Sequence, residues 1–495
     1  MTILDKKLHP DDPDSPTYGQ EILSGMKLVP NYEMKDRHSK YKSTPDVSCY
    51  DNDVDTTEKR TQFDKMNLFA EFKRDKAYNP FRDPKDTANP TEQEKVKFLA
   101  ASEKATDCRS QLVVYASEVN SRQHRCHQFS LYICTDEIRI FRWDQAGAIV
   151  TRAFTFQTGS SLFVKFLWRF SRLSRAKQGF DPTVTEASDE EKTAAKDHLA
   201  EWARSGLERP VRKIAVLDED TNECRYVLTW YEIAERASIT GRATRAMPCL
   251  QITSVNNEIK YELAFLKDYW RHEGLSLESD ILKTIRGAEP KIAHVPSFLC
   301  GGDIKGDETM SQRYRSKPWA CVSDRAGIPG RRRLHHRVLT KEVGIPLRKF
   351  ASTKQMHKAI LHALEGTDLF NVLAFIHDPI TAHRDVFTQL KILHRDVSGN
   401  NILILPDGSG LLNDWDMSRH IDDLKNGPSQ YERTVSFWLV FNSLADVVRV
   451  HGNTCPHASS PTHGKSMKFK MTWNHSSTSK CIIVSDIVNT HFLTP

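Results

Sequence analysis

The chain has 495 residues, which is enough for about three domains of ordinary size. Hydrophobic residues make up 39% of it and charged residues 27%, so a collagen-like chain and a chain that is disordered throughout are both excluded. The formal net charge of +6 is too small to indicate a nucleic-acid partner.

Cysteine usage and hydropathy bear on the compartment. The ten cysteines are scattered and form no C-x-x-C pair, so we expect neither a zinc site nor a disulfide framework. No stretch approaches the ~20 apolar residues of a membrane helix, and the N-terminus lacks the apolar core of a signal peptide. We therefore expect an intracellular protein, cytoplasmic or nuclear, with no membrane partner. The run RRRLHHR at 331–337 has the composition of a nuclear address, but we interpret it as a solvated loop.

The N-terminal part of the chain changes character near residue 40. Residues 1–40 are rich in Asp, Pro, Lys and Ser, which predicts a mobile arm. Residues 41–205 mix helix and strand signals, which predicts an α+β domain. In chain order, these signals are a strand at 66–72, a helix at 111–119, a strand hairpin at 138–156, a helix at 161–173 and a Ser-capped helix at 188–204.

The second part of the chain begins with strands and then becomes helical. Four strand-like runs follow one another from residue 211 to 268, which predicts an antiparallel sheet. After Gly344 the spacing of apolar residues becomes helical, and it predicts one amphipathic helix at 353–364.

The most specific pattern lies between residues 392 and 416. It begins with the motif H-R-D-x-x-x-x-N, which supplies a carboxylate and an amide, and two apolar runs follow. An acidic triplet then supplies a second carboxylate. Phosphoryl transfer needs such a set, because one carboxylate must orient the attacking hydroxyl while the other two groups hold Mg²⁺. The residues of the pattern are His394, Arg395, Asp396, Asn401 and the triplet that begins at Asp414.

On these residues the chain resembles the fungal-type protein kinase family. Further family-like phrases are GRATR at 241–245, LKDYWR at 266–271 and TKEVGIPLRKF at 340–350. The resemblance covers roughly residues 45–434. It implies a two-lobed α+β kinase fold that binds ATP and Mg²⁺ and acts on a protein substrate.

The resemblance also implies roles for individual residues. Asp396 is the catalytic carboxylate, with Arg395 beside it in the catalytic loop, and Asn401 and Asp414 are the Mg²⁺ ligands. The small lobe spans 206–344, and the large lobe, at 345–434, is incomplete.

The nucleotide-binding lysine is Lys267 by resemblance, and its ion-pair partner is Glu278. The phrase ESDILKTI supports Glu278, because its apolar residues form one helical face with Glu278 beside it. Glu273 is the alternative partner.

Nucleotide binding also involves a loop and a hinge in this family. Gly241 belongs to the loop over the phosphates, although Ala243 and Thr244 replace the further glycines of the usual loop. The backbone around Glu342 and Gly344 is the implied hinge that contacts adenine.

The expected product is a phosphorylated serine or threonine, with tyrosine as the alternative, since Ser398 resembles the tyrosine-kinase form of the loop. Only 81 residues follow Asp414 in the 495-residue chain (495 − 414), with no A-P-E segment. We interpret 435–495 as a mis-spliced or frameshifted tail, and a divergent lobe is the rival account. The competing functional hypothesis is a pseudokinase or binding module without turnover.

A second constellation lies in the N-terminal domain. Asp46 follows a proline, Glu71-x-Lys73 lies on a predicted strand, and Gln111-x-x-x-Tyr115 lies on a predicted helix. This order resembles the restriction-nuclease-like P-D…E-x-K fold, in which carboxylates hold a divalent ion. The alternatives are a regulatory remnant of that fold, or simply a charged pair on an exposed strand face.

Overall fold

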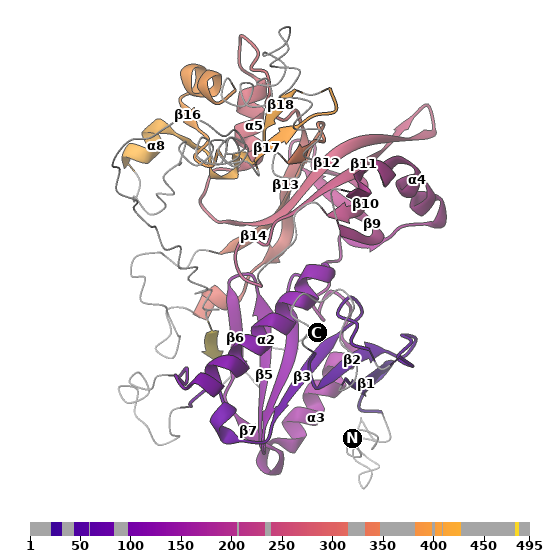
Figure 1. The fold of residues 1–495 in the computed structure, drawn as a ribbon, viewed down its shortest axis with the longest axis vertical. Coiled ribbons are helices and arrows are strands. Elements are labelled where there is room, and N and C mark those ends of the chain that lie inside the picture. Colours follow the sequence, from indigo (N-terminus) through magenta and orange to yellow (C-terminus); the bar gives the residue numbers. More distant parts are fainter. Residues whose placement is uncertain are drawn as a thin grey trace, which may run out of the picture.

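The computed structural model describes residues 21–31, 44–58, 60–83, 98–204, 207–232, 239–314, 332–346, 382–397, 401–407, 409–426 and 481–484. These residues form two units, each built on its own β-sheet, with a small group of strands and helices at the far end of the second unit (Figure 1). None of the described helices has the length and apolarity that a membrane crossing requires. The predicted helix at 353–364 and residue Ser398 lie outside the described residues.

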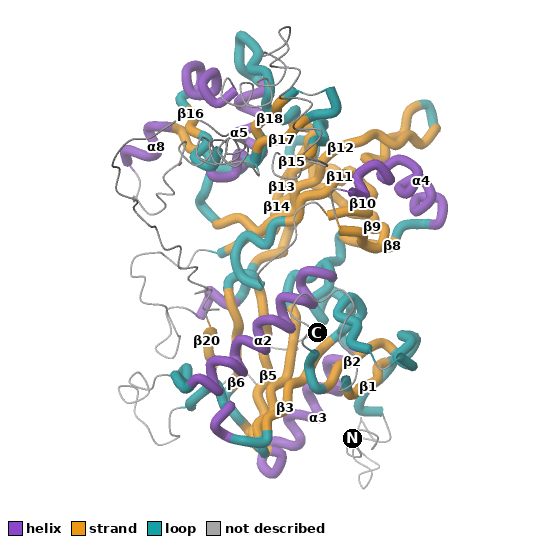
Figure 2. Tube along the Cα trace, in the orientation of Figure 1, coloured by secondary structure: helices purple, strands orange, loops and turns teal. Residues whose placement is uncertain are grey.

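The first unit is a mixed sheet with a helix on each face (Figure 2). β1 to β3 form an antiparallel meander, and β4 then pairs in parallel with β3 because α2 carries the chain back between them. In order across the sheet, the strands are β1 (Met26–Pro30), β2 (Val47–Asp51), β3 (Leu68–Lys73), β4 (Gln128–Cys134), β5 (Glu137–Asp144), β6 (Gly147–Thr151) and β20 (Cys481–Val484), with β7 (Phe154–Thr155) on β5.

Two helices bury the faces of this sheet. Tyr115 of α2 (Glu103–Arg122) packs with Phe69 and Phe141 on one face. Phe166 of α3 (Phe156–Arg172) packs with Leu131 on the other face. Neighbouring residues of one strand thus enter different cores, which is the period-two alternation of a strand covered on both sides. The expected strand, helix and hairpin positions of this domain are confirmed, whereas a mobile arm over 1–40 is wrong for β1, which pairs with β2.

The second unit is an antiparallel sheet of seven strands. Across it, the order is β13 (Phe298–Glu308), β14 (Arg333–Thr340), β12 (Glu258–His272), β11 (Arg245–Val255), β10 (Glu223–Glu232), β9 (Leu207–Asp218) and β8 (Val184–Glu186). Helix α4 (Asp189–Leu199) packs on this sheet through Ala195 and Leu199, while α5 (Glu278–Arg286) packs beside β13. A boundary at residue 205 is therefore wrong, because β8 and α4 already belong to the second sheet.

Short elements complete the second unit beyond its sheet. β17 (Ile402–Ile404) pairs with β18 (Gly410–Leu412) and with β15 (Ile345–Pro346), and β16 (Ile392–Leu393) pairs with β19 (Arg419–His420). Residues 382–390 are helical, and α8 (Ile421–Asn426) follows β19. The expected incomplete lobe at 345–434 is described only in these parts and the expected tail only at β20, so both expectations stay predictions.

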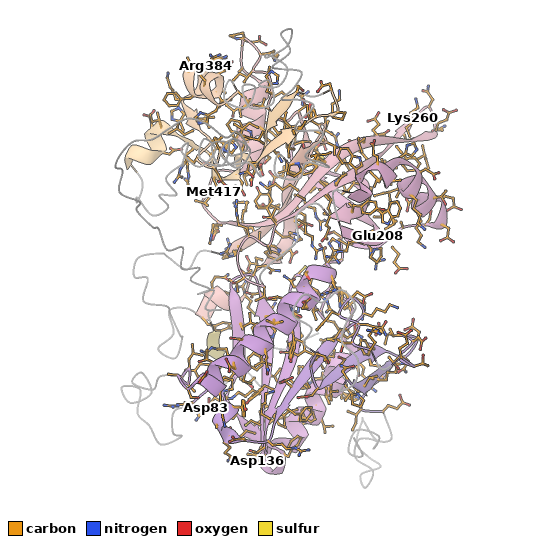
Figure 3. All side chains as sticks on the ribbon, viewed as in Figure 1. Asp83, Asp136, Glu208, Lys260, Arg384 and Met417 are labelled. Carbon is orange, nitrogen blue, oxygen red and sulfur yellow. The ribbon has the colours of Figure 1, made fainter. Side chains whose placement is uncertain are left out.

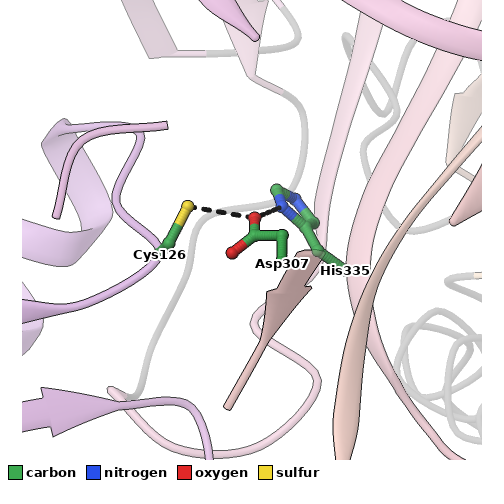
Figure 4. A group of neighbouring side chains, drawn as sticks. All are labelled: Cys126, Asp307 and His335. Atoms are coloured by element: carbon green, nitrogen blue, oxygen red, sulfur yellow. Dashed lines mark hydrogen bonds and ion pairs between the residues drawn. The ribbon is translucent and has the colours of Figure 1, made fainter. Parts of the chain in front are cut away.

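A buried polar network joins the two units. Cys126 of the first unit lies 3.0 Å (Sγ–Oδ2) from Asp307, whose carboxylate is 2.6 Å from Nδ1 of His335 (Figure 4). Nε2 of His335 is 2.6 Å from Asp268, which also accepts a 3.0 Å hydrogen bond from Arg337. The interpretation of 331–337 as a solvated loop is thus wrong for its second half, because β14 buries His335, His336 and Arg337 against carboxylates from other segments. Arg332, just before β14, is exposed.

The protonation of His335 makes this junction sensitive to pH. Burial alone would lower the pKa of His335, but Asp268 and Asp307 raise it from 6.5 to about 9. Since the pKa of His335 is higher in the folded chain than in the unfolded chain, protonation of His335 stabilises the fold. This stabilisation is complete below pH 6.5 and is lost as the pH rises through about 9.

We expect His335→Gln to lower the free energy of unfolding by about 3 kcal/mol near neutral pH and below. The difference from the wild type should shrink as the pH approaches about 10, since wild-type His335 is then neutral as well. Urea unfolding of both proteins across this range measures it. A difference that does not change with pH would contradict a protonated His335.

Candidate active site

Lys267 and Glu278 form a buried ion pair between the second sheet and α5. Nζ of Lys267, on β12, donates a 2.7 Å hydrogen bond to Oε2 of Glu278 in the first turn of α5. The sequence places Glu278 there because α5 buries its apolar residues on the same side. The alternative partner, Glu273, is exposed and pairs with Arg332, so the structure brings Glu278 and not Glu273 to Lys267.

The strands β17 and β18 form the expected hairpin and bring the motif residues together. Nδ2 of Asn401, just before β17, donates a 2.8 Å hydrogen bond to the backbone carbonyl of Asp396. The backbone N–H of Asn413, just after β18, donates a 2.8 Å hydrogen bond to the carbonyl of Asn401. Asp414 follows with φ of +67°, in the left-handed region that few residues other than glycine adopt. The hairpin thus holds Asp396, Asn401 and Asp414 at one end.

His394 is the internal support of this loop. Its ring is buried, its Nε2 lies 2.9 Å from the carbonyl oxygen of Asn413, and it packs edge-on against Trp415. Burial lowers the pKa of His394 to about 4, so the ring is neutral at physiological pH. Arg395 has φ of +68°, a turn that sends the chain from His394 toward Asp396. His394 is therefore a structural residue of the loop.

A centre of opposite charges lies beside the loop. Lys267 forms an ion pair with Asp414, and its Nζ lies 3.3 Å from Oδ2 of Asp416. Arg242 forms a second ion pair with Asp416. Burial alone would raise the pKa of Asp414, but Lys267 and Arg242 hold it well below its usual range. For Asp416, burial and the neighbouring Asp414 raise the pKa to about 7.

Arg242 was not expected from the sequence as a site residue, and Asp416 was expected only as the last residue of the acidic triplet, with no role of its own. The available signals were the position of Asp416 two residues after Asp414 and that of Arg242 next to Gly241. Neither signal reveals the pairing, because 174 residues separate the two partners in the chain.

The donor set fits a divalent cation with a bound triphosphate. Carboxylate and amide oxygens, such as those of Asp414 and Asn401, are the ligand types that Mg²⁺ prefers. One buried oxygen, Oδ1 of Asp416, has no hydrogen-bond partner, which is the condition expected of a ligand atom. The cations of Lys267 and Arg242 stand beside these oxygens and suit phosphate groups.

The loop that carries Gly241 is tied to the first unit. The backbone N–H of Gly241 donates a 2.9 Å hydrogen bond to the carbonyl of Gln145, and that of Trp270 donates a 2.7 Å hydrogen bond to the carbonyl of Arg242. Gly241 has φ of +108°, a conformation that side chains rarely allow. A glycine at this position therefore sets the path of the loop and with it the place of Arg242.

The predicted hinge residues lie between β14 and β15. The carboxylate of Glu342 accepts hydrogen bonds of 2.7 and 2.6 Å from the N–H and hydroxyl of Ser297, so its side chain is used for structure. A Cβ added to Gly344 would lie 2.8 Å from Cβ of Leu403 and 2.9 Å from the carbonyl oxygen of Ile404. Glycine at 344 thus lets the chain between the lobes lie directly on β17.

The second constellation also comes together, in the first unit. Asp46 precedes β2 and lies opposite Glu71 of β3, and its Oδ2 accepts a 2.7 Å hydrogen bond from the N–H of Phe72. Lys73 forms an ion pair with Glu71, whose side chain is 3% exposed. Burial and Asp46 raise the pKa of Glu71 to about 7. An exposed charged pair is therefore excluded as the explanation.

The helix α2 contributes one of its two expected residues. Tyr115 is buried and faces Glu71, and its pKa is raised by burial and by the charge of Glu71. Gln111, one turn earlier, is exposed and does not join the cluster.

Comparisons with known proteins show which family and which solved structures the chain is similar to. A solved structure described as "ROP18 kinase domain in complex with AMP-PNP and sucrose" is 15% identical, with 48% of this chain and 69% of that chain covered and a TM-score of 0.27. ROP2 from Toxoplasma gondii, described as a virulence factor with a protein-kinase fold and no enzymatic activity, is 13% identical, with 48% and 62% covered and a TM-score of 0.23. No curated protein matches. The family model described as fungal protein kinase matches residues 86–371 and 367–442, and the chain therefore belongs to the fungal protein kinase family.

Proposed function

We propose that the chain transfers the γ-phosphate of ATP, with Mg²⁺, to a serine or threonine hydroxyl of a protein, with tyrosine as the alternative acceptor. The observation that carries the proposal is the meeting of Lys267, Glu278 and Asp414 at the end of the hairpin that holds Asp396 and Asn401. Membership of the fungal protein kinase family supports the same reaction class.

Each residue of the site has a chemical task in this proposal. Glu278 holds the ammonium of Lys267 in place, and Lys267 binds phosphate oxygens. Asp396 orients the acceptor hydroxyl and takes its proton, while Asn401 and Asp414 hold Mg²⁺. Bound Mg²⁺ neutralises charge on the phosphates. Because this set acts mainly through position and charge, the hairpin that holds Asp396, Asn401 and Asp414 is the main contribution of the fold.

The test is transfer of labelled γ-phosphate from ATP to a mixture of protein acceptors by the purified full chain. Transfer that requires Mg²⁺ and disappears with a chelator supports the proposal. Nucleotide binding without any transfer would instead favour the alternative, a pseudokinase or partner-binding module. Phosphoamino-acid analysis of the product separates serine and threonine from tyrosine.

A second candidate function belongs to the first unit, and a specific observation favours it. Asp46, Glu71 and Lys73 converge at one end of a β-meander that is followed by a helix and a parallel strand. Two carboxylates and a lysine can hold a divalent ion and polarise a water for phosphodiester hydrolysis. We propose this activity as the second candidate, with a purely regulatory unit as its alternative.

The nuclease candidate predicts cleavage of plasmid DNA or RNA that depends on Mg²⁺ or Mn²⁺. We expect Lys73→Ala and Glu71→Gln to abolish cleavage, because they remove the group that polarises water and a metal ligand. The variant Asp396→Asn is the matched control and should cleave like the wild type, since it lies in the other unit. Cleavage that persists in Lys73→Ala would point to a contaminant.

A further inference from the structure

Asp416 has one oxygen engaged and one oxygen without a partner. Its side chain is 5% exposed, and its Oδ2 pairs with Arg242 and lies 3.3 Å from Nζ of Lys267. Its Oδ1 is buried and accepts no hydrogen bond. A buried carboxylate oxygen in this condition is costly unless a further group binds it.

The charges around Asp416 indicate the sign of that further group. Three carboxylates, those of Glu278, Asp414 and Asp416, surround the two cations Lys267 and Arg242. With every group ionised the cluster carries one excess negative charge in buried surroundings. A cation with oxygen ligands would compensate this charge and would use the free oxygen of Asp416.

We infer that Asp416 is an additional divalent-cation ligand of the phosphate site, and that Arg242 is the counter-ion with which the cation competes. The inference rests on the proposed nucleotide site, but it assigns new roles to Arg242 and Asp416, to which the sequence pattern gives no role of their own. A structural ion pair alone would explain the contact between Arg242 and Oδ2 but not the orphaned Oδ1.

The position of Arg242 is fixed independently of the cation. Its backbone carbonyl accepts a hydrogen bond from Trp270 on β12, and its neighbour Gly241 is bonded to Gln145 of the first unit. The loop therefore fixes the backbone of Arg242, from which the guanidinium reaches Asp416. The guanidinium of Arg242 and a metal ion would bind the same carboxylate, that of Asp416, and they therefore compete for it.

The two variants Asp416→Asn and Arg242→Gln should change metal affinity in opposite directions. We expect Asp416→Asn to weaken Mn²⁺ binding to the nucleotide-free full chain about tenfold, because one anionic ligand is lost. We expect Arg242→Gln to strengthen Mn²⁺ binding, because the competing cation is removed. Electron paramagnetic resonance of free Mn²⁺ measures both affinities, and Asp416→Glu should restore most of the loss.

The matched control is Asp423→Asn, which alters an exposed carboxylate of α8 and should leave Mn²⁺ affinity unchanged. Thermal melting of each variant shows whether it is folded, and Arg242→Gln still decides the sign if Asp416→Asn is not. The inference is overturned if the wild type binds no Mn²⁺, if Asp416→Asn binds it like the wild type, or if both variants weaken it.

The proposed kinase activity can fail separately from this inference. Opposite shifts of Mn²⁺ affinity in a chain that transfers no phosphate would keep the cation site and end the enzyme proposal. Phosphotransfer by the wild type, together with unchanged Mn²⁺ affinity in Asp416→Asn, would keep the enzyme proposal and end the proposed role of Asp416 as a cation ligand.

Discussion

The variant Asp396→Asn is expected to transfer phosphate from ATP about 10²- to 10⁴-fold more slowly than the wild type. An amide in place of the carboxylate cannot take the proton of the acceptor hydroxyl. The fold of the loop should survive, because Asn401 binds the backbone carbonyl of residue 396 and not its side chain. Rates of γ-phosphate transfer at saturating ATP measure the effect.

The chain offers a matched control for this substitution. Residues 383–385 spell the same H-R-D triplet but lack the asparagine five positions on, and they lie in the helix 382–390. We expect Asp385→Asn to keep the wild-type rate. Equal losses in Asp396→Asn and Asp385→Asn, or equal activity in Asp396→Asn and the wild type, would remove Asp396 from the mechanism.

The variant Lys267→Met is expected to lose both nucleotide binding and stability. Methionine keeps the length of the side chain but leaves Glu278, Asp414 and Asp416 without the ammonium that they share. Breaking such a buried arrangement costs about 3–5 kcal/mol of unfolding free energy. Urea unfolding and titration with a fluorescent ATP analogue measure the two losses.

Lys260 supplies the comparison for Lys267 on the same strand. Lys260, which is labelled in Figure 3, lies on the exposed part of β12, near the end of the long hairpin that β11 and β12 form. We expect Lys260→Met to change the free energy of unfolding by no more than about 0.5 kcal/mol and to leave nucleotide binding unaltered. If Lys267→Met is as stable as Lys260→Met, the buried charge centre does not depend on the ammonium of Lys267.

The core of the active site could be predicted from the sequence because its signals are local. The spacing of His394, Asp396 and Asn401 lies within one loop, and the apolar runs on either side fold into β17 and β18. Glu278 was predicted as the partner of Lys267 from the family resemblance, and the apolar face of α5 supported that choice. The structure brings these residues together as expected, and their catalytic roles stay predictions.

The contacts between segments distant in the chain could not be predicted. Arg242 and Asp416 carry no local pattern that pairs them, and the basic residues of β14 have the composition of a solvated loop. Their burial depends on carboxylates such as Asp268 and Asp307, which arrive from other strands. Burial of a charge is favourable only when such partners are present, and a single segment does not show them.

The sequence by itself determined many of the strands and helices, the kinase family and the residues of the catalytic loop, because hydrophobic periodicity and motif spacing act over short distances. Only the tertiary structure decided where the two units divide, which basic residues are buried, and that a third carboxylate with an unpaired oxygen joins the charge centre. These features depend on electrostatic balance among side chains from several elements. Their energies are set by distance in space, and separation along the chain does not reveal that distance.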